Sequence, residues 1–300
     1  MNSRPDDDAL IRAMPLVFVL IWSTGFIVAR YGMPHAPPMK FLAVRYVLSI
    51  LCFLPWILLA KVAWPQSRTQ WLHLGVTGVL MHAGYLGGVW AAVKFGMGSG
   101  LSALIVGLQP VLTAIWLSAT GARVTRRQWA GLALGFAGLA LVVSHKFGQG
   151  AEAHLLNLSL AVLALFSITA GTLYQKRFVT PCDVRSANAV QLGAALLVTL
   201  PLTLLEAEPM HWNAELMGAM AWSVLALTLG GSSLLYLLIQ RGAATAVTSL
   251  LYLVPPTTAL MAWLLFSEPV TTATLLGTAL TAYGVSLVVR TGRGGTPARV

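Results

Sequence analysis

Long uninterrupted apolar blocks constrain this chain more than any other feature of its sequence. The blocks are roughly 17 to 24 residues long, the length that an α-helix needs to cross a hydrocarbon core of about 30 Å. Inside lipid every backbone N–H and C=O group must pair within the protein, so only helices and closed barrels can span. The apolar residues run continuously instead of alternating, which excludes a barrel. The sequence therefore predicts an all-α integral membrane protein.

The overall composition leads to the same class. Hydrophobic residues make up 57% of the chain and charged residues only 9%, whereas soluble domains carry about 25% charged residues. The loops between apolar blocks are short, mostly 4 to 12 residues, and leave no room for a soluble catalytic or regulatory domain. Whatever the protein does should therefore take place inside the helix bundle.

Ten membrane-spanning helices are expected. Their approximate ranges are 13–30, 41–60, 71–92, 99–119, 127–144, 155–174, 187–205, 216–239, 245–266 and 272–289. Of the 19 lysines and arginines, fourteen lie on the side of the N-terminus, four lie on the other side, and Arg45 lies inside the second span. Because positive residues accumulate on the cytoplasmic side, we expect a multi-pass inner-membrane protein with both termini in the cytoplasm. The net charge of +10 then reflects topology, and no nucleic-acid partner is expected.

The sequence contains no pattern typical of a cofactor, a metal or an enzyme. No G-x-x-x-x-G-K-[ST] or H-E-x-x-H motif occurs. Cys52 and Cys182 should lie at different depths and should not pair. Ser99 stands in a Gly-Ser-Gly segment that suits a helix start better than a nucleophile. We therefore expect no enzyme, no cofactor and no metal, and keep an intramembrane enzyme using Ser99 and His82 as an alternative.

The chain contains an internal repeat. A shift of 146 residues aligns its two halves without a gap over most of their length, and it superimposes Gly25 on Gly171, Pro55 on Pro201, Gly84 on Gly230, Pro110 on Pro256, Gly131 on Gly277 and Gly138 on Gly284. Each half holds five spans, and because five is odd the second half must be inverted in the membrane. Inverted repeats around a midplane site are a transporter architecture.

The repeat also sets the expected organisation of the chain. A cytoplasmic tail, 1–12, precedes the first five-helix repeat, 13–144. An extracytoplasmic connector, 145–154, leads to the second repeat, 155–290, and a cytoplasmic tail, 291–300, follows it.

Two stretches resemble a known family. The first, LIWSTGFIV at 20–28, looks like the first-helix signature of the drug/metabolite transporter superfamily, EamA type, and Arg45 early in the second span fits it too. The second, 241–289, resembles the family pattern of proline in the ninth helix, Glu268 at its end and a glycine-patterned tenth helix. The first repeat departs from this pattern, because residues 121–123 read Gly-Ala-Arg where the second repeat has Glu268.

The resemblance covers roughly residues 13 to 290. It implies ten helices in two inverted five-helix repeats and the export of metabolites. Within the family, the general likeness is greatest to exporters of aromatic amino acids.

Prolines are the clearest mechanical feature. Pro110 in the fourth span and Pro255 and Pro256 in the ninth lack a helical N–H and clash with preceding carbonyls. The freed carbonyls belong to Val106, Leu251 and Tyr252. They can serve as acceptors in a cavity, or the prolines can merely kink helices for packing. Pro55 and Pro201 occupy corresponding places in the second and seventh spans and are further candidates for gating.

Polar stripes at helical spacing occur at corresponding places in the two repeats. The third span carries His82, Tyr85 and Val89; the eighth Thr228, Ser232, Tyr236 and Gln240; the fourth Ser99, Ser102, Val106 and Gln109; and the ninth Thr245, Thr248 and Tyr252. Polar stripes avoid lipid, so they face the interior as a cavity lining or as bonds between helices. The expected lining comprises His82, Tyr85, Trp90, Gln109, Ser232, Tyr236, Thr248 and Tyr252.

Two residues in the spans can carry charge. Arg45 can hold an anionic carboxylate, pair with Glu268 or a carbonyl, or reach the interface by snorkelling. His82 can couple transport to protons or simply bond to a neighbouring helix.

Taken together, these features predict a secondary exporter that works by alternating access. The apolar interior fits a neutral or zwitterionic solute with apolar surface, and the family resemblance implies amino acids, aromatic ones included. The expected partners are this small solute and membrane lipid, with the protein acting as a monomer. Efflux of lipophilic cations is the alternative, although no acidic residue lies within a predicted span away from its ends.

Overall fold

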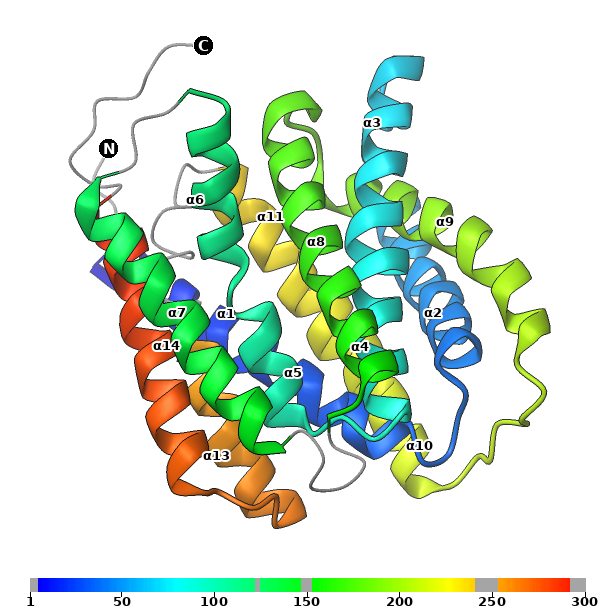
Figure 1. Cartoon of the computed structure of the whole chain (residues 1–300). Helices are drawn as coiled ribbons and strands as arrows, with labels where there is room; N and C mark the ends of the chain where they lie inside the picture. The colour runs from blue at the N-terminus through cyan, green and yellow to red at the C-terminus, as the bar shows by residue number, and fades with distance from the viewer. Residues whose placement is uncertain (1–4, 122–124, 147–152, 241–252, 292–300) are drawn as a thin grey trace.

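The computed structural model describes residues 5–121, 125–146, 153–240 and 253–291 as a helical bundle (Figure 1). The helices of the first half are α1 (Pro5–Gly32), α2 (Pro38–Leu59), α3 (Arg68–Gly78), η1 (Val79–Gly84), α4 (Tyr85–Lys94), α5 (Ser99–Val106), α6 (Gln109–Ala119) and α7 (Arg126–Lys146). Those of the second half are α8 (Leu155–Phe178), α9 (Val184–Leu202), η2 (Thr203–Leu205), α10 (Ala214–Trp222), η3 (Ser223–Ser232), α11 (Ser233–Gln240), α13 (Val254–Phe266) and α14 (Thr272–Thr291).

Seven helical stretches within the described residues are long and apolar enough to cross a membrane. They are Pro38–Leu59, Arg68–Lys94, Ser99–Trp116, Arg126–Lys146, Leu155–Phe178, Val184–Leu205 and Ala214–Tyr236, and shorter apolar helices cover Val17–Gly32 and Val254–Phe266. The protein is therefore an all-α, multi-pass membrane protein.

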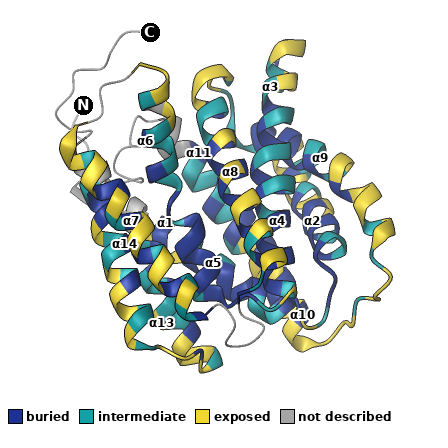
Figure 2. Ribbon diagram, in the orientation of Figure 1, coloured by how far each residue is buried: buried dark blue, intermediate teal, exposed yellow. Residues whose placement is uncertain are grey.

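The side chains are arranged as a lipid environment requires. Large apolar side chains such as Leu59, Leu197 and Phe166 are exposed on the outside of the bundle (Figure 2). Polar side chains such as Asn188 and Gln191 are buried inside it. A soluble monomer rarely exposes such extensive apolar surface, so the outer face fits hydrocarbon.

Two continuous helical stretches change to π-helix in their middle. η1 interrupts the stretch Arg68–Lys94, and η3 interrupts the stretch Ala214–Tyr236. A shift of 146 residues carries η1 into η3. The wider π-turn leaves regular backbone bonds unmade, and Thr228 and Ser232 respond by donating to carbonyls five residues earlier, those of Ser223 and Leu227.

The prolines differ in how strongly they interrupt their helices. Pro110 stands in the first turn of α6, and the helix is broken at residues 107–108 before it. Pro255 and Pro256 likewise stand in the first turn of α13. Pro55 and Pro201 lie inside α2 and α9 close to their C-terminal ends, and these helices continue past them. Leu251 and Tyr252 lie outside the described residues.

α7 and α14 form the most extensive helix pair among the described elements, side by side along one edge of the bundle (Figure 1). Glycines permit their close approach: a methyl group on Gly138 would strike Gly277, and one on Gly284 would lie 2.5 Å from the carbonyl oxygen of Gly131. The offset of 146 turns the first of these contacts into the second. Thr281 donates to the carbonyl of Gly135, so two corresponding positions touch each other.

Corresponding helix ends in the two halves also share hydrogen bonds and backbone conformations. The amide of Gln128 donates to the Thr125 hydroxyl, and the amide of Thr274 donates to the Thr271 hydroxyl. Gly121 after α6 and Ser267 after α13 both adopt left-handed backbone, with φ of 95° and 54°. Each pair is separated by 146 residues, so the two halves repeat local structure as well as sequence.

Candidate functional site

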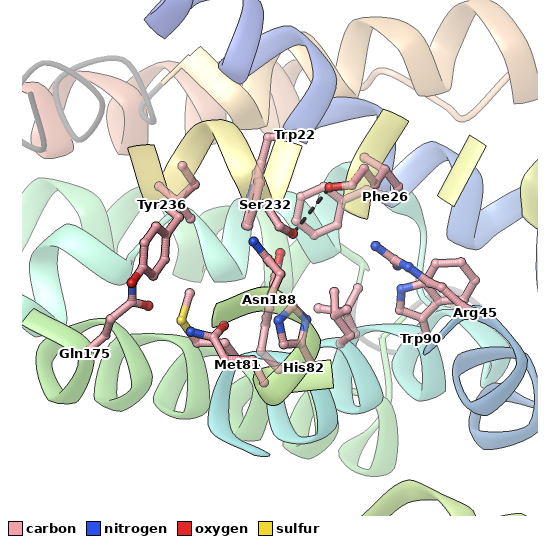
Figure 3. A pocket seen from close by; sticks show the side chains of 17 residues that line it. Trp22, Phe26, Arg45, Met81, His82, Trp90, Gln175, Asn188, Ser232 and Tyr236 are labelled. Atoms are coloured by element: carbon pink, nitrogen blue, oxygen red, sulfur yellow. Dashed lines mark hydrogen bonds between the residues drawn. The ribbon is translucent and has the colours of Figure 1, made fainter. Parts of the chain in front are cut away.

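A cavity lies among helices from both halves of the chain. Its polar lining comprises Arg45, His82, Gln175, Asn188, Gln191 and Ser232. Its aromatic lining comprises Trp22, Phe26, Tyr85, Trp90 and Tyr236 (Figure 3). Small-molecule sites are likewise mostly apolar with a few placed polar groups.

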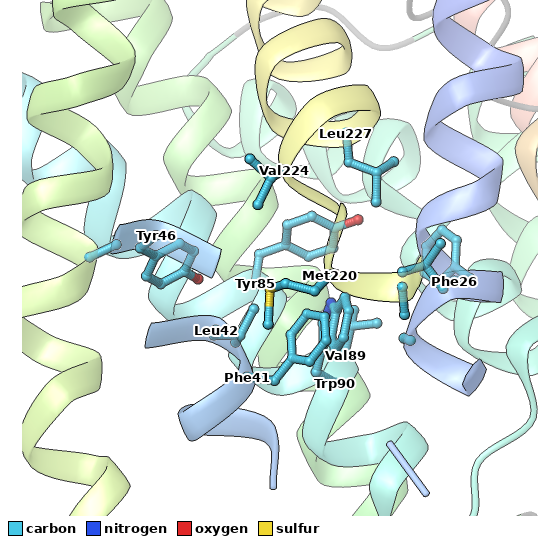
Figure 4. Close-up of a cluster of buried hydrophobic side chains, with 14 of the residues drawn as sticks. Phe26, Phe41, Leu42, Tyr46, Tyr85, Val89, Trp90, Met220, Val224 and Leu227 are labelled. Carbon is cyan, nitrogen blue, oxygen red and sulfur yellow. The ribbon is translucent and has the colours of Figure 1, made fainter. Parts of the chain in front are cut away.

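Aromatic rings build one wall of the cavity. Trp22 of α1 stacks on Tyr85 of α4, with ring centroids 6.2 Å apart and planes 6° from parallel. Trp90, one turn and a half further along α4, stacks on Phe41 of α2 at 4.3 Å. These rings belong to the main buried cluster, in which Val224 and Leu227 of η3 face the aromatic group (Figure 4). This wall of the cavity is therefore apolar and consists of packed rings.

Arg45 supplies a permanent positive charge at one end of the cavity. It is 4% exposed, and its Nε donates to the hydroxyl of Thr228 at 3.1 Å. Its guanidinium carbon lies 5.9 Å from the ring centroid of Trp90. Figure 3 shows the guanidinium pointing along the cavity, and within the described chain no carboxylate pairs with it.

The contact between Arg45 and Thr228 has a counterpart between Gln191 and His82. Gln191 of α9 interacts with His82 of η1, and its side-chain amide nitrogen is buried without a hydrogen-bond partner. The offset of 146 carries Arg45 to Gln191 and His82 to Thr228. The same two-residue contact therefore occurs twice, once with a charge and once without.

Amide and phenol groups form the far end of the cavity. Gln175 and Tyr236 lie at the opposite end from Arg45 and Trp90 (Figure 3). The phenol oxygen of Tyr236 lies 3.1 Å from the sulfur of Cys182, in the loop before α9. Burial raises the pKa of the Cys182 thiol above its usual value, so this end carries no charge from the thiol near neutral pH.

Comparison with known proteins identifies the family. The model of the EamA-like transporter family matches residues 12–144 and again residues 155–290. The chain belongs to the EamA-like transporter family.

Several EamA-type relatives are similar at moderate identity. A Salmonella typhimurium protein named probable amino-acid metabolite efflux pump is 26% identical over 192 residues, 64% of this chain and 62% of the relative. The Escherichia coli inner membrane transporter YedA, described as uncharacterized, is 26% identical over 208 residues, 69% of this chain and 66% of the relative. The chain thus aligns with slightly less than two thirds of each of these two proteins.

Other similarities extend over nearly the whole chain. The uncharacterized Bacillus subtilis transporter YvbV is 25% identical over 284 residues, 92% of this chain and 90% of the relative. A solved crystal structure with a TM-score of 0.66 and 17% identity covers 93% of this chain and 97% of its own. The latter likeness concerns the fold alone.

The structure brings five of the predicted lining residues of this EamA protein together. His82, Tyr85, Trp90, Ser232 and Tyr236 all line the cavity. Thr248 and Tyr252, with Thr245, lie outside the described residues. The stripe of the fourth span faces elsewhere: Gln109 donates to the hydroxyl of Thr172 on α8 at 3.0 Å, and Ser99 and Ser102 are buried away from the lining. The helix break before Gln109 turns this stripe aside.

Two expectations for Arg45 are corrected. It does not pair with Glu268, because that carboxylate accepts the backbone N–H groups of Ser99 at 2.9 Å and Gly100 at 3.4 Å. Glu268 thus satisfies free amides and the dipole at the start of α5. Arg45 does not snorkel either, because it is almost fully buried beneath Thr228 and Trp90.

The sequence analysis left several lining residues unassigned. Asn188 and Gln191 are amides in the first half of α9, three positions apart, which places them on one helix face. Gln191 is also the counterpart of Arg45 under the repeat offset. These two features were the available signals for this part of the lining.

Proposed function

We propose that this EamA-type protein is a secondary exporter of small organic solutes, with ten spans arranged as two inverted five-helix repeats. The solute would occupy the cavity between the halves, and the halves would rock about it by alternating access. The proposed substrates are amino acids and amino-acid metabolites, aromatic ones included. The observation that carries the proposal is the cavity shared by both halves.

The exchanged contacts support the inverted repeat. The offset converts Arg45–Thr228 into Gln191–His82, as a two-fold axis between the halves would. The separate matches of the family model to 12–144 and 155–290 support the same division. The C-terminal ends of α6 and α13, which correspond in the repeat, lie at opposite ends of the bundle (Figure 1).

The distribution of positive charge supports an inner-membrane orientation with both termini in the cytoplasm. Lysine and arginine concentrate on the side of the N-terminus, and the positive-inside rule assigns that side to the cytoplasm. A solute leaving the cell would then enter the cavity from the end formed by Gln175 and Tyr236.

Solute class is proposed from the lining and from one relative. The aromatic wall fits a solute with apolar surface, and the polar lining fits one with a polar head. The Salmonella relative carries the name of a probable amino-acid metabolite efflux pump. Lipophilic cations fit less well, because Arg45 would repel them.

A substitution that fills the cavity with a large side chain tests the proposal. Gly25 lines the cavity, and a methyl group placed on it would make only ordinary contacts, the nearest at 3.7 Å. Gly25→Phe should therefore fold and fill the cavity. In liposomes loaded with labelled phenylalanine and with 3-phenylpropionate, we expect the wild type to release at least one solute and Gly25→Phe to release neither.

Gly218→Phe is the matched control, because no atom lies within 4 Å of a methyl group there. It should transport as the wild type does. Ser99→Ala should also retain transport, since Ser99 lies outside the lining. Equal flux through wild type and Gly25→Phe would contradict the proposed site, and release of cationic dyes alone would favour the alternative solute class.

A further inference from the structure

We propose that the cavity selects organic monocarboxylates that carry an apolar body and no free ammonium group, in preference to zwitterionic amino acids. The proposal rests on the exporter function and, among amino-acid metabolites, selects those without an amino group. It depends on two donors, Arg45 and Gln191, in one cavity whose described lining holds no carboxylate.

Arg45 has hydrogen-bond donors available for an anion in the cavity. Its hydrogen bond to Thr228 uses Nε and leaves the two terminal nitrogens for the cavity. A charge inside a membrane protein is costly unless it is paired, and the face of Trp90 compensates it only in part. A guanidinium binds a carboxylate through two parallel hydrogen bonds, the strongest pairing available to it.

Gln191 adds a second unused donor. It is 4% exposed and lines the cavity, and its amide nitrogen has no hydrogen-bond partner. Arg45 and Gln191 line the same cavity, so a solute in it can meet both donors. Leaving a buried donor unpaired is unfavourable, and an acceptor on the solute would remove that cost.

Nothing in the described lining would balance an ammonium group. The carboxylates that the structure resolves outside the cavity have partners there: Glu206 caps α2, Glu268 caps α5, and Glu208, Glu215 and Asp183 pair with Lys94, His35 and Arg185. No Asp or Glu belongs to the cavity lining. The ammonium of a solute would therefore rely on neutral oxygens.

The α-amino group is also in the wrong place. It is attached to the carbon next to the carboxylate, so a carboxylate bound by Arg45 holds the ammonium close to the guanidinium. Like charges at such distances repel strongly where the dielectric constant is low. The amide of Gln175 and the phenol of Tyr236 lie at the opposite end of the cavity from Arg45 (Figure 3).

A set of three solutes with one carbon skeleton tests the proposal. 3-Phenylpropionate carries the carboxylate alone, phenylalanine both groups and phenethylamine the ammonium alone. Binding to the purified full-length protein in lipid nanodiscs is measured by calorimetry at pH 7.5. We expect 3-phenylpropionate to bind at least tenfold more tightly than phenylalanine and phenethylamine not to bind, as loss of about 1.4 kcal/mol corresponds to tenfold.

Variants of the lining residues test which side chains produce the preference for 3-phenylpropionate over phenylalanine. Arg45→Gln should weaken 3-phenylpropionate binding by roughly tenfold or more, as expected for a hydrogen bond to a charged group, and should abolish the preference over phenylalanine. Arg45→Lys should retain part of it. Gln191→Met should weaken binding of the acid by a smaller factor, and Arg177→Gln, on the exposed end of α8, should bind as the wild type does.

The outcomes separate this inference from the proposed function. If phenylalanine binds the wild type as tightly as 3-phenylpropionate and is released from loaded liposomes, the carboxylate selection is wrong and the exporter stands. If neither solute binds nor crosses, the exporter function for this class fails as well. If Arg45→Gln does not fold, the comparison of the three solutes on the wild type and on Arg45→Lys decides.

Discussion

The contact between α7 and α14, here called the seam, and the cavity between the other helices differ in how closely the helix backbones approach each other. Each region is built from segments that correspond in the two halves of the chain. At the seam, glycines remove side chains and let two backbones touch, as between Gly138 and Gly277. Around the cavity, π-helical turns widen the backbone and large rings form the lining, as Trp22 and Tyr85 do. Small residues thus bring two backbones together in one region, whereas large side chains line an opening in the other.

The largest expected effect is at the seam. Gly138→Leu should separate α7 from α14, because even a methyl group there would strike the Gly277 carbonyl and Thr281. Overpacking of this kind costs about 3 kcal/mol or more. We expect a strong fall in the melting temperature in detergent, measured by fluorescence. Gly218→Leu is the matched control and should melt near the wild type, and equal losses in both variants would remove the distinction between the regions.

The cavity should respond much less. Gln191→Met removes a buried amide nitrogen that has no partner, but it also removes the interaction of Gln191 with His82, so we expect the free energy of unfolding to change by no more than about 1 kcal/mol. Binding of 3-phenylpropionate should weaken in the same variant. A thermal scan with and without the solute measures both, and a variant that is less stable yet binds unchanged would argue for a purely structural amide.

Corresponding helix ends offer a smaller and more symmetric test. Ser267 holds left-handed backbone that its counterpart, Gly121, adopts without cost. Ser267→Gly should stabilise the protein by about 1 kcal/mol, and Gly121→Ala should destabilise it by a similar amount. Melting temperatures of the two variants measure this, and shifts of the same sign would contradict the assigned backbone conformations.

The smallest effect concerns pH at the start of α9. The hydrogen bonds from Arg185 lower the pKa of Asp183 below its usual value. Its stabilising contribution is therefore complete above the unfolded pKa of about 4 and is lost as the pH falls through the folded pKa. Asp183→Asn keeps an oxygen for the Arg185 amide and should flatten the dependence of melting temperature on pH below 5. An unchanged slope would mean that other groups produce it.

The sequence predicted the coarse structure well, because apolar length, proline and charge act locally. The all-α class followed from apolar runs, and the break before α6 followed from Pro110. The π-helices carry no proline and were not predicted, since they arise from packing between helices. Gln109 donates to Thr172 and is not among the described lining residues, a placement that the break at residues 107–108 made hard to foresee from one straight helix. Gln191 could be found from its spacing with Asn188 and as the counterpart of Arg45, and the second relation has meaning only once the halves face each other.

Sidedness at the ends of α6 and α13 tests the central claim most directly. Thr120 and Ser267 are exposed at corresponding helix ends, and single cysteines there, in a chain with Cys52 and Cys182 replaced by serine, can be labelled with a membrane-impermeant maleimide. An inverted repeat predicts that Ser267→Cys is labelled in intact cells and Thr120→Cys only after the membrane is opened. Labelling of both from the same side would contradict the inverted repeat and the alternating access built on it.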